Sequence, residues 1–74
     1  MKYRIDVIIE QDSDGFYAFC PALEGCQSQG QTFEQAMQNI QEAAELYWET
    51  LSPEEIQALT NTQVISTALE VAVA

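Results

Sequence analysis

The stretch that most constrains this chain is FYAFCPALEGCQSQGQTFEQA, residues 16–36, in which a β-prone run, a proline, two glycines and a helix-start signal follow one another. Pro21 cannot donate a backbone hydrogen bond to a neighbouring strand, so it predicts the end of the strand before it. Gly25 and Gly30 are expected to permit the turns that follow. Thr32 opens a Thr-x-x-Gln capping box, whose hydroxyl and amide satisfy free backbone N–H groups at a helix start. The stretch therefore predicts a strand–loop–strand–helix junction.

Three short strands are expected around this junction. From Tyr3 to Ile9 apolar residues alternate with other residues, which is the period-two pattern of a strand with one buried face, and Ile8 alone interrupts the polar face. A turn rich in Asp and Ser follows, where Gly15 can take a positive φ as the chain reverses. Residues 2–20 thus predict a β-hairpin, and residues 26–29 predict a short third strand.

One long amphipathic helix is predicted after Thr32. Apolar residues recur there at spacings of four and three, while acidic and amide side chains fall away from that stripe. The stripe consists of Phe33, Met37, Ile40, Ala44, Tyr47 and Leu51. A second, short helix is predicted from the N-cap Ser52, which precedes a proline and two glutamates, to about Leu59.

Two large apolar residues lie off the centre of this stripe and are candidates for contact with a partner or a second subunit. At ~100° per residue, Trp48 lies about 80° to one side of Ile40 and Leu46 about 120° to the other. Packing against the hairpin or the C-terminal tail would also account for them. For Leu46 both interpretations stay open.

The C-terminal run TALEVAVA predicts a fourth strand over residues 67–73, because Leu69, Val71 and Val73 alternate with other residues. A hairpin, one short strand and one helix leave an exposed sheet edge, which a fourth strand would partly cover. We expect a homodimer, a tetramer or another homo-oligomer in which this strand lies at or near a subunit contact, with Glu70 facing water. The alternative is a monomer whose tail pairs within its own subunit.

Cys20 and Cys26 are five residues apart, which does not match the Cys-x-x-Cys spacing of zinc and redox motifs. The chain has no histidine, so zinc would need carboxylate ligands, and no base or cation stands nearby in the sequence to activate a thiol. A disulfide is sterically allowed. We favour two buried small hydrophobic residues at the facing ends of the second and third strands.

Four carboxylates near the N-terminus raise the question of a two-carboxylate or magnesium site. Asp12 and Asp14 lie in the turn, where aspartate commonly bonds the local backbone. Asp6 and Glu10 lie on the polar face of a strand, where a carboxylate is usually solvated. No phosphate-binding glycine-rich loop is present in the sequence. The sequence therefore predicts no catalytic residue, no metal site and no cofactor, and hence no enzyme.

Twelve acidic residues stand against two basic ones, Lys2 and Arg4, so the formal net charge is −10. Phosphate backbones and anionic membranes are bound by clustered Lys and Arg, so neither nucleic acid nor membrane is an expected partner. The charge serves solubility, or it attracts a basic protein. No stretch has the apolar core of a secretory signal or the ~20 apolar residues of a membrane span, which predicts a cytoplasmic protein. We expect one domain over residues 1–74.

Several motifs occur in a fixed order: an Asp-x-Asp-Gly turn, an aromatic strand, a Cys-Pro-x-Leu-x-Gly-Cys loop, a Ser-x-Gly-x-Thr link, and a Gln-Ala pair followed by Asn in the helix. They occupy residues 12–15, 16–19, 20–26 and 28–32, and Gln35, Ala36 and Asn39. In these motifs residues 3–50 resemble the HicB-like antitoxin family. The resemblance implies an α+β fold of order β-β-β-α-β, with an antiparallel sheet packed on one helix, similar to a degraded ribonuclease H-like fold without its catalytic carboxylates.

The resemblance also implies a function. Such a domain binds a small basic HicA-type toxin that cleaves messenger RNA, and it covers the toxin's catalytic histidine. Longer antitoxins add a C-terminal DNA-binding domain, for which the residues after the long helix are too few and too acidic, so DNA binding is not expected. The alternative is an orphan domain without a toxin, which self-associates or binds a ligand.

Overall fold

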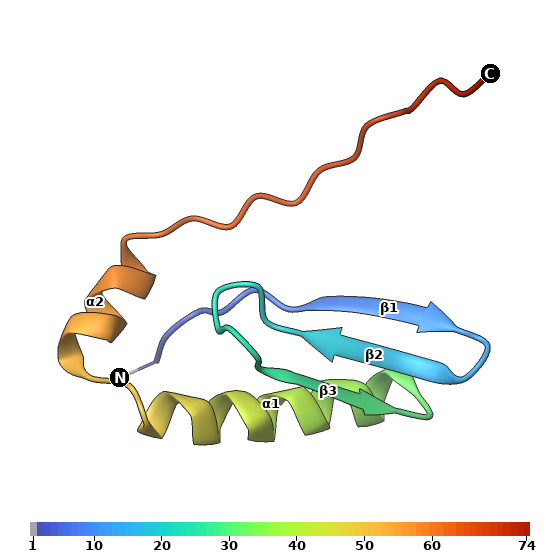
Figure 1. Ribbon diagram of the computed structural model, residues 1–74. Helices are drawn as coiled ribbons and strands as arrows, with labels where there is room; N and C mark the ends of the chain where they lie inside the picture. Colours follow the sequence, from blue (N-terminus) through green and yellow to red (C-terminus); the bar gives the residue numbers. More distant parts are fainter. Residues whose placement is uncertain (1) are drawn as a thin grey trace.

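The computed structural model describes residues 2–74 and contains one antiparallel sheet and two helices (Figure 1). The strands follow one another in the sheet in the order β1-β2-β3. They are β1 (Ile8–Asp12), β2 (Gly15–Phe19) and β3 (Gln27–Gly30). Helix α1 packs along one face of this sheet, so the predicted α+β fold with an antiparallel sheet on a helix is confirmed.

The hairpin of β1 and β2 closes with Asp12 paired opposite Gly15 across a two-residue turn. The Oδ1 atom of Asp12 accepts a hydrogen bond from the backbone N–H of Asp14 at 2.8 Å. Gly15 has a φ of +137°, a region that residues with a Cβ rarely adopt. The predicted hairpin and the role of its glycine are therefore confirmed.

The first strand begins later than the alternation of apolar residues predicts. Its pairing ends with Ile8 opposite Phe19, because the chain after Phe19 leaves the sheet in a turn. Residues 3–7 consequently have no neighbouring strand in the described structure and are not part of the ladder. The predicted bounds Tyr3–Ile9 are wrong, because alternation of apolar residues predicts burial of one face and does not predict where a neighbouring strand is available.

Helix α1 (Phe33–Glu49) starts at the predicted N-cap, Thr32. The Oγ1 atom of Thr32 accepts a hydrogen bond from the N–H of Gln35 at 3.1 Å. The side-chain oxygen of Gln35 accepts from the N–H of Gln31 at 2.8 Å, one residue before the N-cap. Helix α2 (Pro53–Thr60) begins at Ser52, where the Ser52 and Glu55 side chains each accept from the other residue's backbone.

Gly30 is not the turn glycine that the sequence predicts. It is the last residue of β3, and the positive φ values belong to Gly15 and Gly25 among residues 2–74. A Cβ on Gly30 would lie 2.7 Å from the backbone nitrogen of Ala36. Gly30 therefore allows the first turns of α1 to approach the sheet closely.

This close approach selects the buried face of α1. Ala36 and Ile40 are fully buried, whereas Phe33 and Met37 of the predicted stripe are exposed. The small core lies between the inner face of the sheet and α1, and it consists of Ala18, Cys20, Leu23, Cys26, Ala36 and Ile40. Because α1 lies mainly against β3 and β2, the side of the helix next to β1 stays open.

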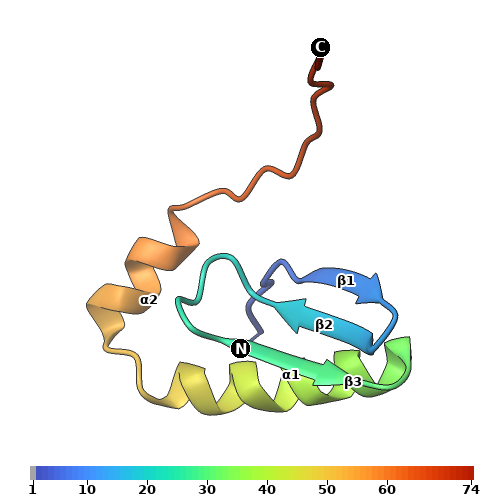
Figure 2. The same cartoon turned by 45° about the vertical axis from the view of Figure 1, so that its right-hand side comes forward.

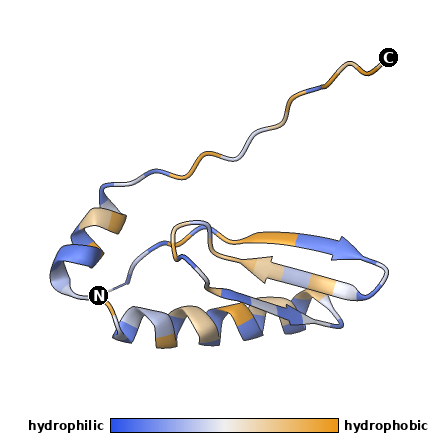
Figure 3. Cartoon of the chain, in the orientation of Figure 1, coloured by the Kyte–Doolittle hydropathy of each residue, from blue (hydrophilic) through white to orange (hydrophobic). Residues whose placement is uncertain are grey.

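The predicted fourth strand is absent from the described residues. Residues 63–74 have no secondary structure and lead away from the sheet in both views (Figures 1 and 2). A strand needs a backbone partner, and the single chain supplies none along this path. The observed order is therefore β-β-β-α-α followed by a tail, in place of β-β-β-α-β. Apolar residues recur along this tail (Figure 3).

Neither helix in the described part of the chain is long and apolar enough to cross a membrane.

Candidate protein-interaction site

Cys20 and Cys26 close the loop that joins β2 to β3. The N–H of Cys20 donates to the carbonyl oxygen of Cys26 at 3.1 Å, both thiols are free and buried, and Leu23 is buried with them. Gly25 has a φ of +80°, whereas exposed Pro21 starts the loop. Burial, together with the neighbouring Cys26, raises the pKa of Cys20 to about 11. The two cysteines therefore pack inside the junction and hold its ends together. Because a protonated thiol is a poor nucleophile, Cys20 is also unreactive.

The carboxylates near the N-terminus are scattered on the surface. Asp6, Glu10, Asp12 and Asp14 are all exposed, and Asp12 serves the hairpin turn. Within residues 2–74, no three Cys, Asp or Glu side chains are grouped so that they could hold a metal ion.

An apolar groove runs between the N-terminal segment and α1, on the side that the helix leaves open next to β1. It has a volume of about 670 Å³. Tyr3, Ile5 and Val7 form one wall. The other wall belongs to α1, and Cys20 lies between the two. The helix contributes Met37, Ile40, Gln41, Ala44, Glu45 and Trp48. A groove of this composition can take an apolar segment of chain.

Trp48 closes one end of this groove by packing within its own chain. Its ring lies 4.8 Å from that of Tyr3, centroid to centroid, at an interplanar angle of 36°. Trp48 is half-buried, so the flank-packing interpretation describes its position in the single chain. Packing against the hairpin region was one of the interpretations, but the specific pair with Tyr3 was not predicted, because Tyr3 is 45 positions away along the chain.

Leu46 and the tail carry the most exposed large apolar side chains of the described residues. Leu46 is 65% exposed on α1. In the tail, Leu69 is 81% exposed, Val71 73% and Val73 87%. These four are the candidate contact residues of the sequence that the structure places in solvent. It does not bring Leu46 and the tail together, since the tail leads away from the helix (Figure 2).

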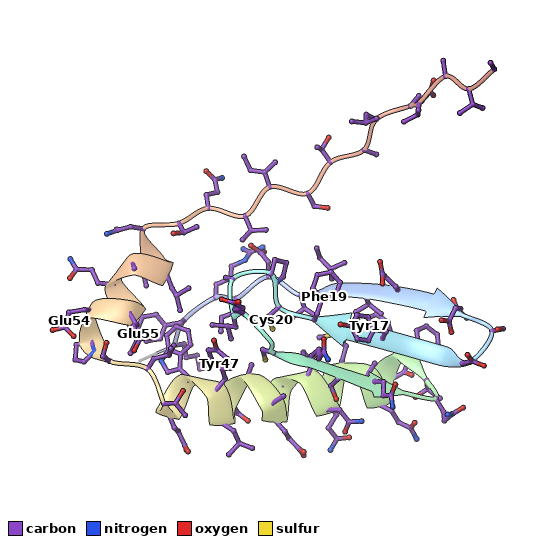
Figure 4. All side chains as sticks on the ribbon, in the orientation of Figure 1. Tyr17, Phe19, Cys20, Tyr47, Glu54 and Glu55 are labelled. Carbon is purple, nitrogen blue, oxygen red and sulfur yellow. The ribbon has the colours of Figure 1, made fainter. Side chains whose placement is uncertain are left out.

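A further apolar patch lies on the open face of the sheet, and the sequence reasoning missed it. Ala18 faces α1, so its neighbours Tyr17 and Phe19 point to the opposite face (Figure 4). Their ring centroids are 5.6 Å apart, and Ile8 is paired opposite Phe19. The sequence did contain one indication of this apolar patch, because Ile8 interrupts the polar face of its strand. We call Ile8, Tyr17 and Phe19 the open-face patch.

Acidic and polar groups border the open-face patch. Glu10 is paired opposite Tyr17 on β1. The hydroxyl of Tyr17 donates to the side-chain oxygen of Gln27 at 2.6 Å, which holds the ring over β3. An aromatic face beside a carboxylate can accept a Lys or Arg side chain through both charge and cation–π attraction.

The chain belongs to the HicB-like antitoxin family of bacterial toxin–antitoxin systems, whose family model matches residues 3–72. It is 57% identical over 53 residues to a UPF0150 protein of Synechocystis, which covers 70% of this chain and 67% of the relative. It is 41% identical over 70 residues to a UPF0150 protein of Helicobacter pylori, covering 95% and 97% respectively. A Thermoplasma acidophilum relative is 50% identical over 52 residues, covering 69% and 72%. No solved structure is significantly similar to the chain.

Membership of this family supports an antitoxin role, implies a toxin partner and indicates a non-enzymatic function. The match reaches residue 72, beyond the residues 3–50 in which the motifs of the sequence resemble the family. Most of the exposed tail is therefore part of the family domain.

Proposed function

We propose that this chain is a protein-binding module that neutralises a small, basic, HicA-type toxin by covering the site with which the toxin cleaves messenger RNA. The match of the antitoxin family model over residues 3–72 carries the proposal. The formal net charge of −10 supports it, because opposite charge speeds the encounter with a basic partner. The same charge opposes direct binding of RNA or DNA.

The open-face patch is the surface that we assign to the toxin. It combines apolar area from Ile8 and Phe19 with the Tyr17 ring beside Glu10, which suits the Lys and Arg side chains of a basic protein. The patch also lies on the face of the sheet opposite α1, so this helix does not cover it (Figure 4).

Co-expression with a basic, histidine-containing protein encoded next to this chain tests the proposal. The expected results are co-purification of the two proteins, rescue of growth, and loss of RNA cleavage in vitro when this chain is added. Tyr17→Ala should weaken the complex, while Gln38→Ala, an exposed change on α1, should not. A neighbour of this kind that stays toxic and does not co-purify would refute the proposal.

The second candidate function is an orphan domain that self-associates without a toxin. The exposed apolar residues of the tail favour it. Native mass spectrometry of the protein taken from its own cells distinguishes the two, since homo-oligomers alone are expected for an orphan and a complex with a basic protein for an antitoxin.

A further inference from the structure

We infer that two copies of this chain exchange their tails, so that residues 65–73 of each copy lie in the apolar groove between the N-terminal segment and α1 of the other. The inference does not depend on the proposed toxin. It extends the prediction of a strand at or near a subunit contact: the strand forms between two chains, because the single chain provides no partner for it.

The groove and the tail match in chemistry. The groove presents Tyr3, Ile5 and Val7 from one wall and α1 side chains from the other. The tail presents Leu69, Val71 and Val73 at a period of two, all of them largely exposed. An extended segment with this period places the three side chains on one face, which can enter the groove while its backbone runs beside the N-terminal segment and the free edge of β1.

The starting point of the tail favours exchange. Val64, four residues after the end of α2, lines a depression together with Tyr3, Arg4 and Ile5. From there the tail leaves its own sheet (Figures 1 and 2). Each copy therefore has a tail that starts near its own N-terminal segment and then projects away from its own sheet, together with an open groove, which is the arrangement that reciprocal exchange requires.

The low charge of the tail favours it as the part of a second copy that occupies the groove. At −10 two copies repel each other over most of their surfaces, but Lys2 and Arg4, the only basic residues of the chain, are exposed in the N-terminal segment beside the groove. Glu70 is the only charged side chain between residues 56 and 74. With Leu69 and Val71 in the groove, Glu70 faces outward, on the side of Arg4 and Asp6 when Tyr3 and Ile5 face inward, and it is attracted in the register that places it opposite Arg4.

The mass of the full-length protein in solution, measured by light scattering and native mass spectrometry at about 1–100 μM, tests the inference. We expect a dimer or a larger even-numbered assembly for the native chain. Val71→Glu should give the 8.3 kDa monomer, and Ala72→Glu, which adds the same charge on the other face of the tail, should leave the assembly intact. Circular dichroism identifies any variant that fails to fold.

Mixing separates exchange between chains from pairing within one chain. Met37→Glu blocks the groove at an exposed position, and Gln38→Glu is its control on the solvent side of α1. Met37→Glu and Val71→Glu chains should each be monomeric alone and form a heterodimer when mixed, because one intact tail then meets one intact groove. A monomeric native chain at 100 μM, or a dimer that persists with Val71→Glu, overturns the inference. So does the lack of a heterodimer from two folded variants.

Discussion

The ring of Trp48, in the last turns of α1, lies 4.8 Å from the ring of Tyr3, so the end of the long helix is packed against the N-terminal segment. This contact holds one wall of the groove in place although residues 3–7 belong to no strand. It also accounts for Trp48 lying off the centre of the predicted stripe.

We therefore expect Tyr3→Ala to destabilise the protein by about 1–2 kcal/mol, which is the loss of an aromatic pair together with part of its buried area. Urea unfolding of native, Tyr3→Ala, Trp48→Ala and doubly substituted chains measures the coupling between the two rings. Leu46→Ala, an exposed change on the same helix, should alter the free energy of unfolding by less than about 0.5 kcal/mol in a monomeric background. Additive effects of the two ring substitutions would show that the contact contributes nothing.

Gly25 and Gly30 should respond differently to substitution. A Cβ added at Gly25 would meet open space, but the φ of this residue is +80°, so we expect Gly25→Ala to lower the free energy of unfolding by about 1–2 kcal/mol. Gly25→Asn should lower it less, because asparagine tolerates this region of φ. Gly30→Ala should cost about 1–3 kcal/mol or more through its clash with Ala36, and Gly30→Asn should be at least as harmful. Thermal unfolding of the four variants checks this, and rescue of Gly30 by asparagine would contradict the role in close packing.

The raised pKa of Cys20 predicts loss of stability at high pH. In the unfolded chain the thiol ionises near pH 9, but in the folded protein it stays protonated up to about pH 11. Below pH 9 the two states bind this proton equally. Between pH 9 and 11 unfolding releases the proton, so the free energy of unfolding falls as the pH rises through this range. Because tyrosines also ionise there, the measurement is the difference in slope between the native chain and Cys20→Ala, and equal slopes would contradict the prediction.

The N-terminus of α2 predicts an effect at low pH. The backbone N–H of Ser52 donates to Glu55 at 2.9 Å, and this bond, followed by the Ser52 side chain, lowers the pKa of Glu55. A lowered pKa in the folded state gives a contribution to stability that is present at neutral pH and is lost as the pH falls through that value. Ser52→Ala should raise the pKa of Glu55 toward its ordinary value in a carbon-13 NMR titration and weaken α2 by about 0.5–2 kcal/mol. A Glu55 pKa at the ordinary value of a glutamate in the native chain would show that the cap does not form in solution.

Local chemistry was readable from the sequence alone. The hairpin turn with Gly15 and the N-caps Thr32 and Ser52 depend on residues within a few positions of one another, and the structure has them as predicted. The family too could be recognised from short motifs in fixed order, and the match over residues 3–72 bears this out.

Tertiary structure decided what depends on distant partners. The start of β1 is set by where β2 leaves the sheet, and the buried face of α1 is set by the approach of Gly30 to Ala36. The tail has the apolar alternation of a strand, yet a strand exists only where a second backbone supplies hydrogen bonds. Alternation in a sequence specifies which side chains favour burial, whereas the partner that buries them, in the same chain or in another, is settled by the positions of all the other elements.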